Sequence, residues 1–296
     1  YQLARDAYNI KTGRLDNYLL EDACNGEDRI IDKVLEANLG SRLIDDDHVV
    51  CVGPKEDILS KKTPAHVLEQ GSSLEDNIEK GAGYLYDELG YSNEYFLICC
   101  GDLGGITPET QDLFIRSAEE RVDEETKVIA SVGTMETLSG LIQEYALRAY
   151  GKPHPFPLAP NGIRKLATPM VDDVGTAGEK GKVQWFYWGN QFLAHESLIR
   201  HKELAAAAYS LKRVFLNAEI LPWFFRKVGA KGMERLFKKK MTLTQGEGYA
   251  TDLFNSRFPY VDGLGIKTAY IGPESVLDID TWKDHARIST LLSKRQ

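Results

Sequence analysis

Short apolar runs alternate with longer amphipathic stretches along most of this chain. The apolar runs have the length of buried strands and lie at His48–Val52, Ala65–Glu69, Tyr95–Cys100, Lys127–Val132, Val183–Trp188 and Gly265–Ile271. The amphipathic stretches have apolar residues three or four apart and lie at Asp28–Leu39, Ser73–Leu89, Glu136–Tyr150, Glu196–Leu216, Ile220–Phe237 and Trp282–Leu292. This alternation predicts an α/β protein with a mainly parallel sheet.

Helix-start and loop residues support the same division of the chain. Ser73 stands at an expected N-cap, and Thr107 precedes Pro108 in the order typical of a helix beginning. Residues 152–160 contain four prolines, which excludes a helix or a central strand there. Residues 161–182 are rich in Gly, Asp and Lys, and we expect a long surface loop.

The composition is that of a globular protein. The chain has 296 residues, of which 43% are hydrophobic and 27% charged, which argues against disorder or a disulfide scaffold. We expect one domain over 1–296 with an added helical segment at about 196–245. Cys24, Cys51, Cys99 and Cys100 have no metal-ligand spacing and are expected to be reduced thiols. Without a signal peptide pattern or a long apolar span, a cytoplasmic protein is expected, although a start at Tyr1 indicates residues upstream.

The charge of −8 excludes a general nucleic-acid binder, but it is unevenly spread. Residues 16–47 hold ten acids and three bases, whereas residues 212–240 hold nine bases and two acids. The basic segment could be a solvated helix face or could bind a phosphorylated substrate. It could also make a weak contact with an anionic membrane surface, with Trp223, Phe224 and Phe225 entering the interface.

The strongest candidate for chemistry follows the apolar run that ends at Cys100. Gly101 and Asp102 come directly after it, and Gly104 and Gly105 follow. Ligands of open parallel sheets bind beyond the carboxyl ends of strands, where an aspartate can hold Mg²⁺ beside a phosphate. The alternative is that Asp102 caps a turn before the helix that begins at Thr107.

Two further acids lie near the C-terminal end of the chain. Asp278 and Asp280 are two residues apart, so on an extended segment both carboxylates point to one face. A divalent cation relieves the repulsion between such a pair. Helix capping by Asp280 is the alternative.

A Gly–Ser loop and a Gly–Asn pair complete the set of motifs. Gly71, Ser72 and Ser73 precede a helix that contains Asn77, and backbone N–H groups at a helix start can bind an anion. An ordinary N-cap explains this loop equally well. Gly189 and Asn190 follow an aromatic strand and by themselves indicate only a turn.

Taken in order, these motifs resemble the MobA-like NTP transferases, a nucleotidyltransferase family with a GT-A type α/β fold. The resemblance rests on the helix 29–37, the strand 49–53, the loop 71–77, the segment 101–109, the pair 189–190 and the acidic segment 278–284. It implies a three-layer α/β/α, Rossmann-like architecture. It also implies Mg²⁺-dependent transfer of a nucleotidyl group from a nucleoside triphosphate to a small phosphorylated acceptor.

The resemblance assigns a role to each candidate residue. Asp102 and Asp280 would be catalytic, and Asp102, Asp278 and Asp280 would hold the metal. The nucleotide would lie against Gly71, Ser72, Ser73, Asn77 and Gly101. The acceptor would lie against Gly189, Asn190, Lys212 and Arg213.

The chain departs from the family pattern at its N-terminal end. The family's glycine-rich loop with its Arg and Lys is not visible in residues 1–28, and Asn17 stands near the position of the usual Lys. A non-catalytic member that binds a nucleotide or a partner is therefore a second hypothesis. A GT-A glycosyltransferase is a third, although Gly101–Gly104 offers only one acid where such enzymes have an Asp-x-Asp motif.

Overall fold

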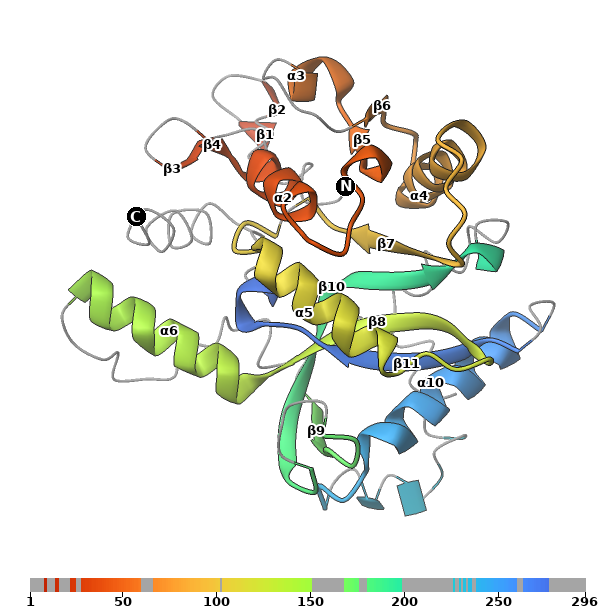
Figure 1. Ribbon diagram of the computed structural model, residues 1–296. Helices are drawn as coiled ribbons and strands as arrows, with labels where there is room; N and C mark the ends of the chain where they lie inside the picture. Colours follow the sequence, from red (N-terminus) through yellow and green to blue (C-terminus); the bar gives the residue numbers. More distant parts are fainter. Residues whose placement is uncertain are drawn as a thin grey trace.

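The protein is seen in a computed structural model that describes residues 8–9, 14–15, 22–24, 28–59, 66–101, 103–150, 168–175, 180–198, 226, 229, 231–232, 234–235, 238–259 and 263–276. Its largest sheet has the order β11-β8-β10-β7, with β9 beside β10 (Figure 1). These strands are β7 (Tyr95–Cys99), β8 (Thr126–Thr134), β9 (Thr168–Val171), β10 (Val183–His195) and β11 (Gly265–Tyr270). β10 is antiparallel to β7, β8 and β9, whereas β11 is parallel to β8. Every strand of this sheet except β10 therefore runs in one direction, which confirms the mainly parallel sheet.

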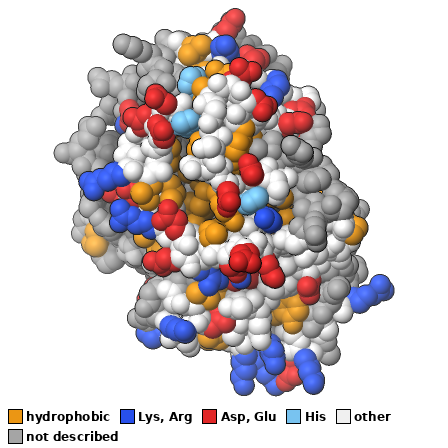
Figure 2. Space-filling model, turned by 45° about the vertical axis from the view of Figure 1, so that its right-hand side comes forward, with side chains coloured by type: hydrophobic (Ala, Val, Ile, Leu, Met, Phe, Trp, Pro, Cys, Tyr) orange, Lys and Arg blue, Asp and Glu red, His pale blue; other side chains and the backbone are white. Residues whose placement is uncertain are grey.

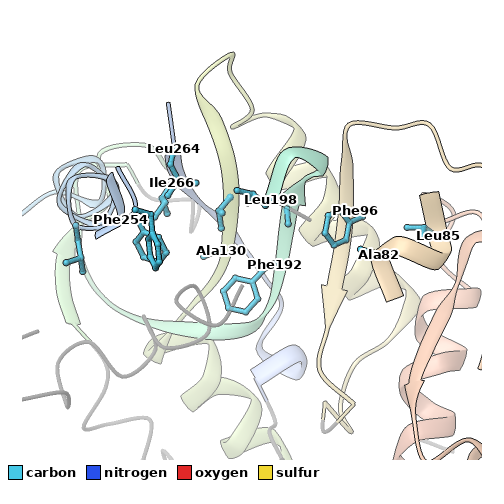
Figure 3. Packing of buried hydrophobic residues seen from close by; sticks show 13 residues of the cluster. Ala82, Leu85, Phe96, Ala130, Phe192, Leu198, Phe254, Leu264 and Ile266 are labelled. Carbon is cyan, nitrogen blue, oxygen red and sulfur yellow. The ribbon is translucent and has the colours of Figure 1, made fainter. Parts of the chain in front are cut away.

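Helices cover both faces of this sheet. The described α-helices are α2 (Ile30–Leu39), α3 (Lys55–Leu59), α4 (Leu74–Gly83), α5 (Pro108–Glu119), α6 (Met135–Tyr150) and α10 (Leu243–Arg257). Ile129 of β8 packs on one face against Phe114 of α5. Its neighbour Ala130 belongs to a cluster on the other face with Phe254 of α10 and Ala82 of α4 (Figure 3). Successive strand residues point to opposite faces, so β8 is buried on both and the expected three-layer architecture is confirmed.

A second, smaller parallel pair lies beside α2 and α3. It consists of β5 (Val50–Gly53) and β6 (His66–Glu69), and its apolar side chains pack with Leu35 of α2 and Ile58 of α3. Short N-terminal strands pair in two hairpins, β1 (Tyr8–Asn9) with β2 (Arg14–Leu15) and β3 (Asp22–Cys24) with β4 (Asp28–Arg29). Because β4 includes Asp28, the helix expected from that residue begins at Ile30.

Single-turn elements complete the described secondary structure. Three are 3₁₀ turns, η2 (Asp46–His48), η4 (Glu196–Leu198) and η5 (Pro273–Val276). The fourth, η3 (Tyr84–Glu88), is a π-helical turn that continues α4. Gly90 then has a φ of 70°, a conformation that favours glycine after a helix, so the helix expected over Ser73–Leu89 is confirmed.

Several expectations about the second half were wrong. The strand expected to end at Gly189 continues to His195, and β9 lies inside the segment 161–182 that was expected to be a loop. α10 was not expected, since Gly246 and Gly248 are poor helix formers. Its beginning is stabilised by a capping box, in which Thr242 and Gln245 each bond the other's backbone N–H. Buried contacts of its apolar face then outweigh the low propensity.

The remaining sequence expectations concern the cysteines, membrane-spanning helices and the helices expected late in the chain. Cys51, Cys99 and Cys100, the cysteines whose side chains are described, are not joined in disulfides. Among the helices that the structure describes, none combines the length and the apolar character that crossing a bilayer requires. Of the helix expected over Glu196–Leu216, only Glu196–Leu198 is described, as the 3₁₀ turn η4, and the helix expected over Trp282–Leu292 lies outside the described residues. Within the helical stretch expected over Ile220–Phe237, the described residues are helical, and they are Arg226, Gly229, Lys231, Gly232, Glu234 and Arg235.

Candidate functional site

The turn that follows β7 is firmly anchored on both sides of Asp102. Leu103 and Ile106 are buried against α2, and Cys99 and Cys100 pack in the same cluster. The N–H of Ile106 donates to the carbonyl oxygen of Leu103 at 3.1 Å, which closes the turn before α5. Asp102 itself lies outside the described residues.

α5 begins directly after this turn, as the sequence predicts. Thr107 is its N-cap, and its hydroxyl accepts from the N–H of Thr110 at 3.3 Å. Pro108 occupies the first turn. The pKa of Glu109 is lowered by a hydrogen bond from its own backbone N–H and by the Thr107 hydroxyl. The first turn of α5 therefore carries a stable negative charge in the segment that follows this turn.

The Gly–Asn pair lies in a bulge of β10, not in a terminal turn. Trp188 pairs with Val132 of β8, but the next paired residue, Phe192, lies opposite Ala130. The residues between them bulge out of the ladder, and the N–H of Cys100 donates to the carbonyl oxygen of Asn190 at 3.3 Å. The bulge thereby brings the Gly–Asn motif against the end of β7. The contacting residue there, Cys100, is two positions before Asp102 in the sequence.

Gly189 allows the bulge to form. A Cβ at this position would lie 2.3 Å from Ser131 Oγ and 2.6 Å from Ile271 Cδ1. The same Ser131 hydroxyl accepts from the N–H of Gln191 at 3.2 Å. Asn190 is only 3% exposed, so the bulge is held by close contacts on every side. A side chain larger than hydrogen at position 189 has no room.

A chain of buried amides supports the bulge from the helix layer. Gln191 Nε2 donates to Gln111 Oε1 at 2.7 Å, and Gln111 Nε2 donates to Asn38 Oδ1 at 2.6 Å. Asn38 Nδ2 in turn donates to the carbonyl oxygen of Val34 at 2.7 Å. Gln111 and Gln191 are both fully buried, and among the described residues Gln191 Oε1 has no hydrogen-bond partner. The chain connects α2, α5 and β10, so these three elements hold a fixed relative position at the end of β7.

Sequence reasoning did not find this chain of amides. Asn38 and Gln111 are 73 residues apart and Gln111 and Gln191 are 80 apart. Gln111 lies on the buried face of α5 together with Phe114 and Ala118. A polar residue on an otherwise apolar helix face is the sequence signal that could have indicated a buried hydrogen bond. The partners of Gln111 depend on how three elements pack and leave no local pattern.

The Gly–Ser loop is closed by the side chains of its own helix. Gly71 N–H donates to Asn77 Oδ1 at 2.6 Å, and Ser72 N–H donates to Asp76 Oδ2 at 3.3 Å. Ser73 is the N-cap of α4, and its hydroxyl accepts from the N–H of Asp76 at 3.2 Å. The loop also adjoins β5, since Gln70 N–H donates to the carbonyl oxygen of Gly53 at 2.9 Å. The capping role expected for Ser73 is confirmed, and the N–H groups of Gly71 and Ser72 are bonded within the chain.

The structure therefore brings only part of the expected site together. Gly101, Gly189 and Asn190 lie at the end of β7, while Gly71, Ser72, Ser73 and Asn77 form the loop before α4. Asp102, Asp278, Asp280, Lys212 and Arg213 lie outside the described residues. Within the described ranges, no three His, Cys, Asp or Glu side chains are grouped closely enough to hold a metal ion.

Comparison with solved structures places this arrangement among known folds. A hypothetical transferase from Thermus thermophilus superimposes with a TM-score of 0.54 and 19% identity, over 88% of this chain and 87% of that one. The likeness establishes the fold. CMP:2-keto-3-deoxy-manno-octonic acid synthetase, solved with CTP, superimposes with a TM-score of 0.50 and 11% identity, over 98% of this chain and 96% of that one. No protein-family model matches this sequence, and no curated protein does.

Proposed function

We propose that this protein is a nucleotidyltransferase of the MobA-like type, which transfers a nucleoside monophosphate from a nucleoside triphosphate to a small phosphorylated acceptor. The observation that carries the proposal is the contact between Cys100 and Asn190. It joins two motifs about 90 positions apart in the sequence at the carboxyl end of β7, and ligands of open α/β sheets bind beyond the carboxyl ends of strands. The fold is also that of a synthetase solved with CTP, which supports a nucleotide as the ligand.

Mg²⁺ is the metal that the donor set suits. Asp102, Asp278 and Asp280 would supply carboxylate oxygens to the ion. Oxygen donors of this kind are the ligands that Mg²⁺ prefers. When bound, such an ion offsets the charge of the phosphates that the carboxylates would otherwise repel. In this proposal Asp102 and Asp280 are the catalytic carboxylates.

The rest of the site divides between nucleotide and acceptor. Gly101 lets the nucleotide approach the backbone, and the loop Gly71–Ser73 with Asn77 forms the opposite side of the nucleotide site. Gly189 and Asn190 would contact the acceptor. Lys212 and Arg213 would neutralise its phosphate or the leaving pyrophosphate.

Two measurements on the intact chain test this function. Isothermal titration with ATP, GTP, CTP and UTP in the presence of Mg²⁺ measures nucleotide binding, and release of pyrophosphate with a panel of sugar phosphates measures turnover. We expect one nucleotide to bind and Asp102→Ala to abolish pyrophosphate release. Asp252→Ala, which removes an exposed carboxylate of α10, is the matched control and should behave as the unaltered chain does. Absence of binding by all four nucleotides, or full activity of Asp102→Ala, contradicts the proposal.

One observation favours a second function, a member of the fold that binds a nucleotide or a partner without catalysis. The N–H groups of Gly71 and Ser72 already donate to Asn77 and Asp76, so binding an anion at this loop requires those bonds to exchange. The acidic segment 16–47 also stands where a basic triphosphate loop is expected from the resemblance. Nucleotide binding without pyrophosphate release for any acceptor would identify this second function.

A further inference from the structure

The hairpin of β9 and β10 presents two apolar side chains to solvent. Val183 and Trp185 are 46% and 42% exposed, whereas Gln184 and Phe186 between and after them are buried. This alternation follows from the strand geometry, because neighbouring residues point to opposite faces. Val183 and Trp185 therefore form a pair of exposed apolar side chains on one face of β10.

The basic run 238–240 is fixed against this hairpin. Val171 N–H of β9 donates to the carbonyl oxygen of Met241 at 2.7 Å, and Thr244 N–H donates to Asp173 Oδ1 at 3.1 Å. Lys239 has a φ of 54°, which is costly for a residue with a Cβ, and its Nζ lies 5.3 Å from the centre of the Trp185 ring. The lysines and the tryptophan therefore form one surface.

This surface is strongly positive. Figure 2 shows Lys and Arg side chains gathered at the lower end of the molecule, the end at which Figure 1 places β9 and the segment 226–240. The described basic residues that are exposed in the β9–β10 connection and in the segment 226–240 are Lys180, Lys182, Arg226, Lys231, Arg235, Lys238, Lys239 and Lys240. Glu234 is paired with Lys238, which neutralises one of these charges. We name Val183, Trp185 and these basic residues the hairpin surface.

We propose that the hairpin surface binds an anionic lipid bilayer. Basic side chains are attracted to acidic headgroups, while Trp185 and Val183 enter the headgroup region, where a tryptophan ring is stabilised at the interface. The rest of the chain is strongly acidic, so repulsion from an anionic bilayer turns this end toward the membrane. This proposal concerns a different surface from the nucleotide site and does not depend on the proposed function.

The hairpin surface suits a bilayer better than a nucleic acid. Lys239 lies over the Trp185 ring, so that face of the ring is not free to stack on a base. Val183 has no group that a base or phosphate could bind, but it gains free energy when it leaves water for an apolar phase. The apolar and basic residues would therefore both contribute to binding at a lipid interface.

Co-sedimentation of the intact chain with vesicles tests the proposal. We expect binding to vesicles of phosphatidylcholine with one third phosphatidylserine, little binding to phosphatidylcholine alone, and weaker binding as salt is raised. The triple variant Lys238→Gln, Lys239→Gln, Lys240→Gln should bind on the order of a hundredfold less, because each lysine contributes about a fivefold factor. Its thermal unfolding should match that of the unaltered chain, since these side chains are exposed.

Arg42→Gln, Lys55→Gln, Arg116→Gln is the charge-matched control, because these exposed basic residues lie on other elements. It should retain vesicle binding. In a second measurement, brominated lipids should quench part of the tryptophan fluorescence of the bound chain, and Trp185→Phe should remove that part. Equal binding to both kinds of vesicle, equal loss in both triple variants, quenching unchanged by Trp185→Phe, or binding to an oligonucleotide without binding to vesicles would each overturn the proposal.

Discussion

The N–H of Cys100 donates to the carbonyl oxygen of Asn190 across 3.3 Å. Cys100 follows β7, and Asn190 stands in the middle of β10, so this bond connects two strands at the point where the ladder of β10 is interrupted. The bulge residue Asn190 of β10 and the glycine-rich turn after β7 therefore share one end of the sheet.

Gly189→Ala should destabilise the protein. The new Cβ would stand 2.3 Å from Ser131 Oγ and 2.6 Å from Ile271 Cδ1, so the bulge or both neighbours must move. We expect a loss of about 1–3 kcal/mol in the free energy of unfolding, as for other overpacked cores. Urea denaturation measures it. Gly140→Ala on α6 is the control: nothing lies within 4 Å of its Cβ, so it should stabilise the helix by up to about 1 kcal/mol. Equal effects of the two variants would contradict this account of Gly189.

Gln111→Ala should lower the free energy of unfolding, both because its own contacts are lost and because its buried partners lose their hydrogen bonds. It removes the hydrogen bonds that the Gln111 side chain makes with Asn38 Oδ1 and Gln191 Nε2 in a buried layer, at about 1–3 kcal/mol for a group left unpaired. The double variant with Gln191→Ala should lose less than the sum of the two single variants, because both remove the same hydrogen bond. Strict additivity in this double-mutant cycle, measured by chemical denaturation, would show that the amides do not act as one chain.

Glu247→Gln should be strongly destabilising. Both oxygens of Glu247 accept from Arg121 Nη2 at 2.7 Å, and Oε1 also accepts from the N–H and hydroxyl of Thr268. The variant leaves the Arg121 charge partly buried and unpaired, which costs about 3–5 kcal/mol in comparable pairs.

Glu36→Gln gives the matched comparison for this pair. It breaks the exposed pair with Lys33 and should cost less than about 1 kcal/mol. The two variants are compared by thermal or urea unfolding under the same conditions. A difference of less than about 1 kcal/mol between them would refute the structural role given to Glu247.

The protonation of His195 should make the stability depend on pH. Burial and then the nearby charge of Lys127 lower the pKa of His195 below its ordinary value of 6.5. The folded state therefore binds fewer protons than the unfolded state below that pH, and stability falls as the pH drops through 6.5 and on through the lower, folded pKa. His195→Gln should flatten the dependence measured by urea unfolding between about pH 8 and about pH 5. Lys127→Gln should reduce it, since one cause of the lowered pKa is gone. An unchanged slope in His195→Gln would assign the dependence to other groups.

Gly71→Ala should disturb the loop before α4. A Cβ at position 71 would lie 2.6 Å from Asp76 Cβ, so the bond from Gly71 N–H to Asn77 Oδ1 cannot be kept in its present geometry. If the loop forms one side of the nucleotide site, the affinity for the nucleotide falls together with stability, which titration calorimetry and thermal unfolding measure separately. Gly83→Ala is the control, since only Asp87 Oδ2, at 3.9 Å, lies near its Cβ. Unchanged affinity in Gly71→Ala would remove the loop from the proposed site.

Local features of the chain could be predicted from the sequence because they depend on neighbours a few positions apart. Ser73 and Thr107 cap their helices as expected, since a cap needs only the residues of the first turn. The run Val128–Val132 is recognisable as a doubly buried strand because every residue in it is apolar or small. The motif residues Gly101, Gly189 and Asn190 were also found as candidates, but their adjacency was not.

The tertiary structure alone decided which distant groups meet. The bulge at Gly189 requires the approach of Ser131 and Ile271, and the sequence around Gly189 predicts only a turn. The position of Lys239 over Trp185 depends on hydrogen bonds between Met241 and β9. The hydrophobic pattern specifies which face of an element is buried, but not which polar group of another element it meets there. The packing of whole elements determines these contacts, both at the end of β7 and at the hairpin surface.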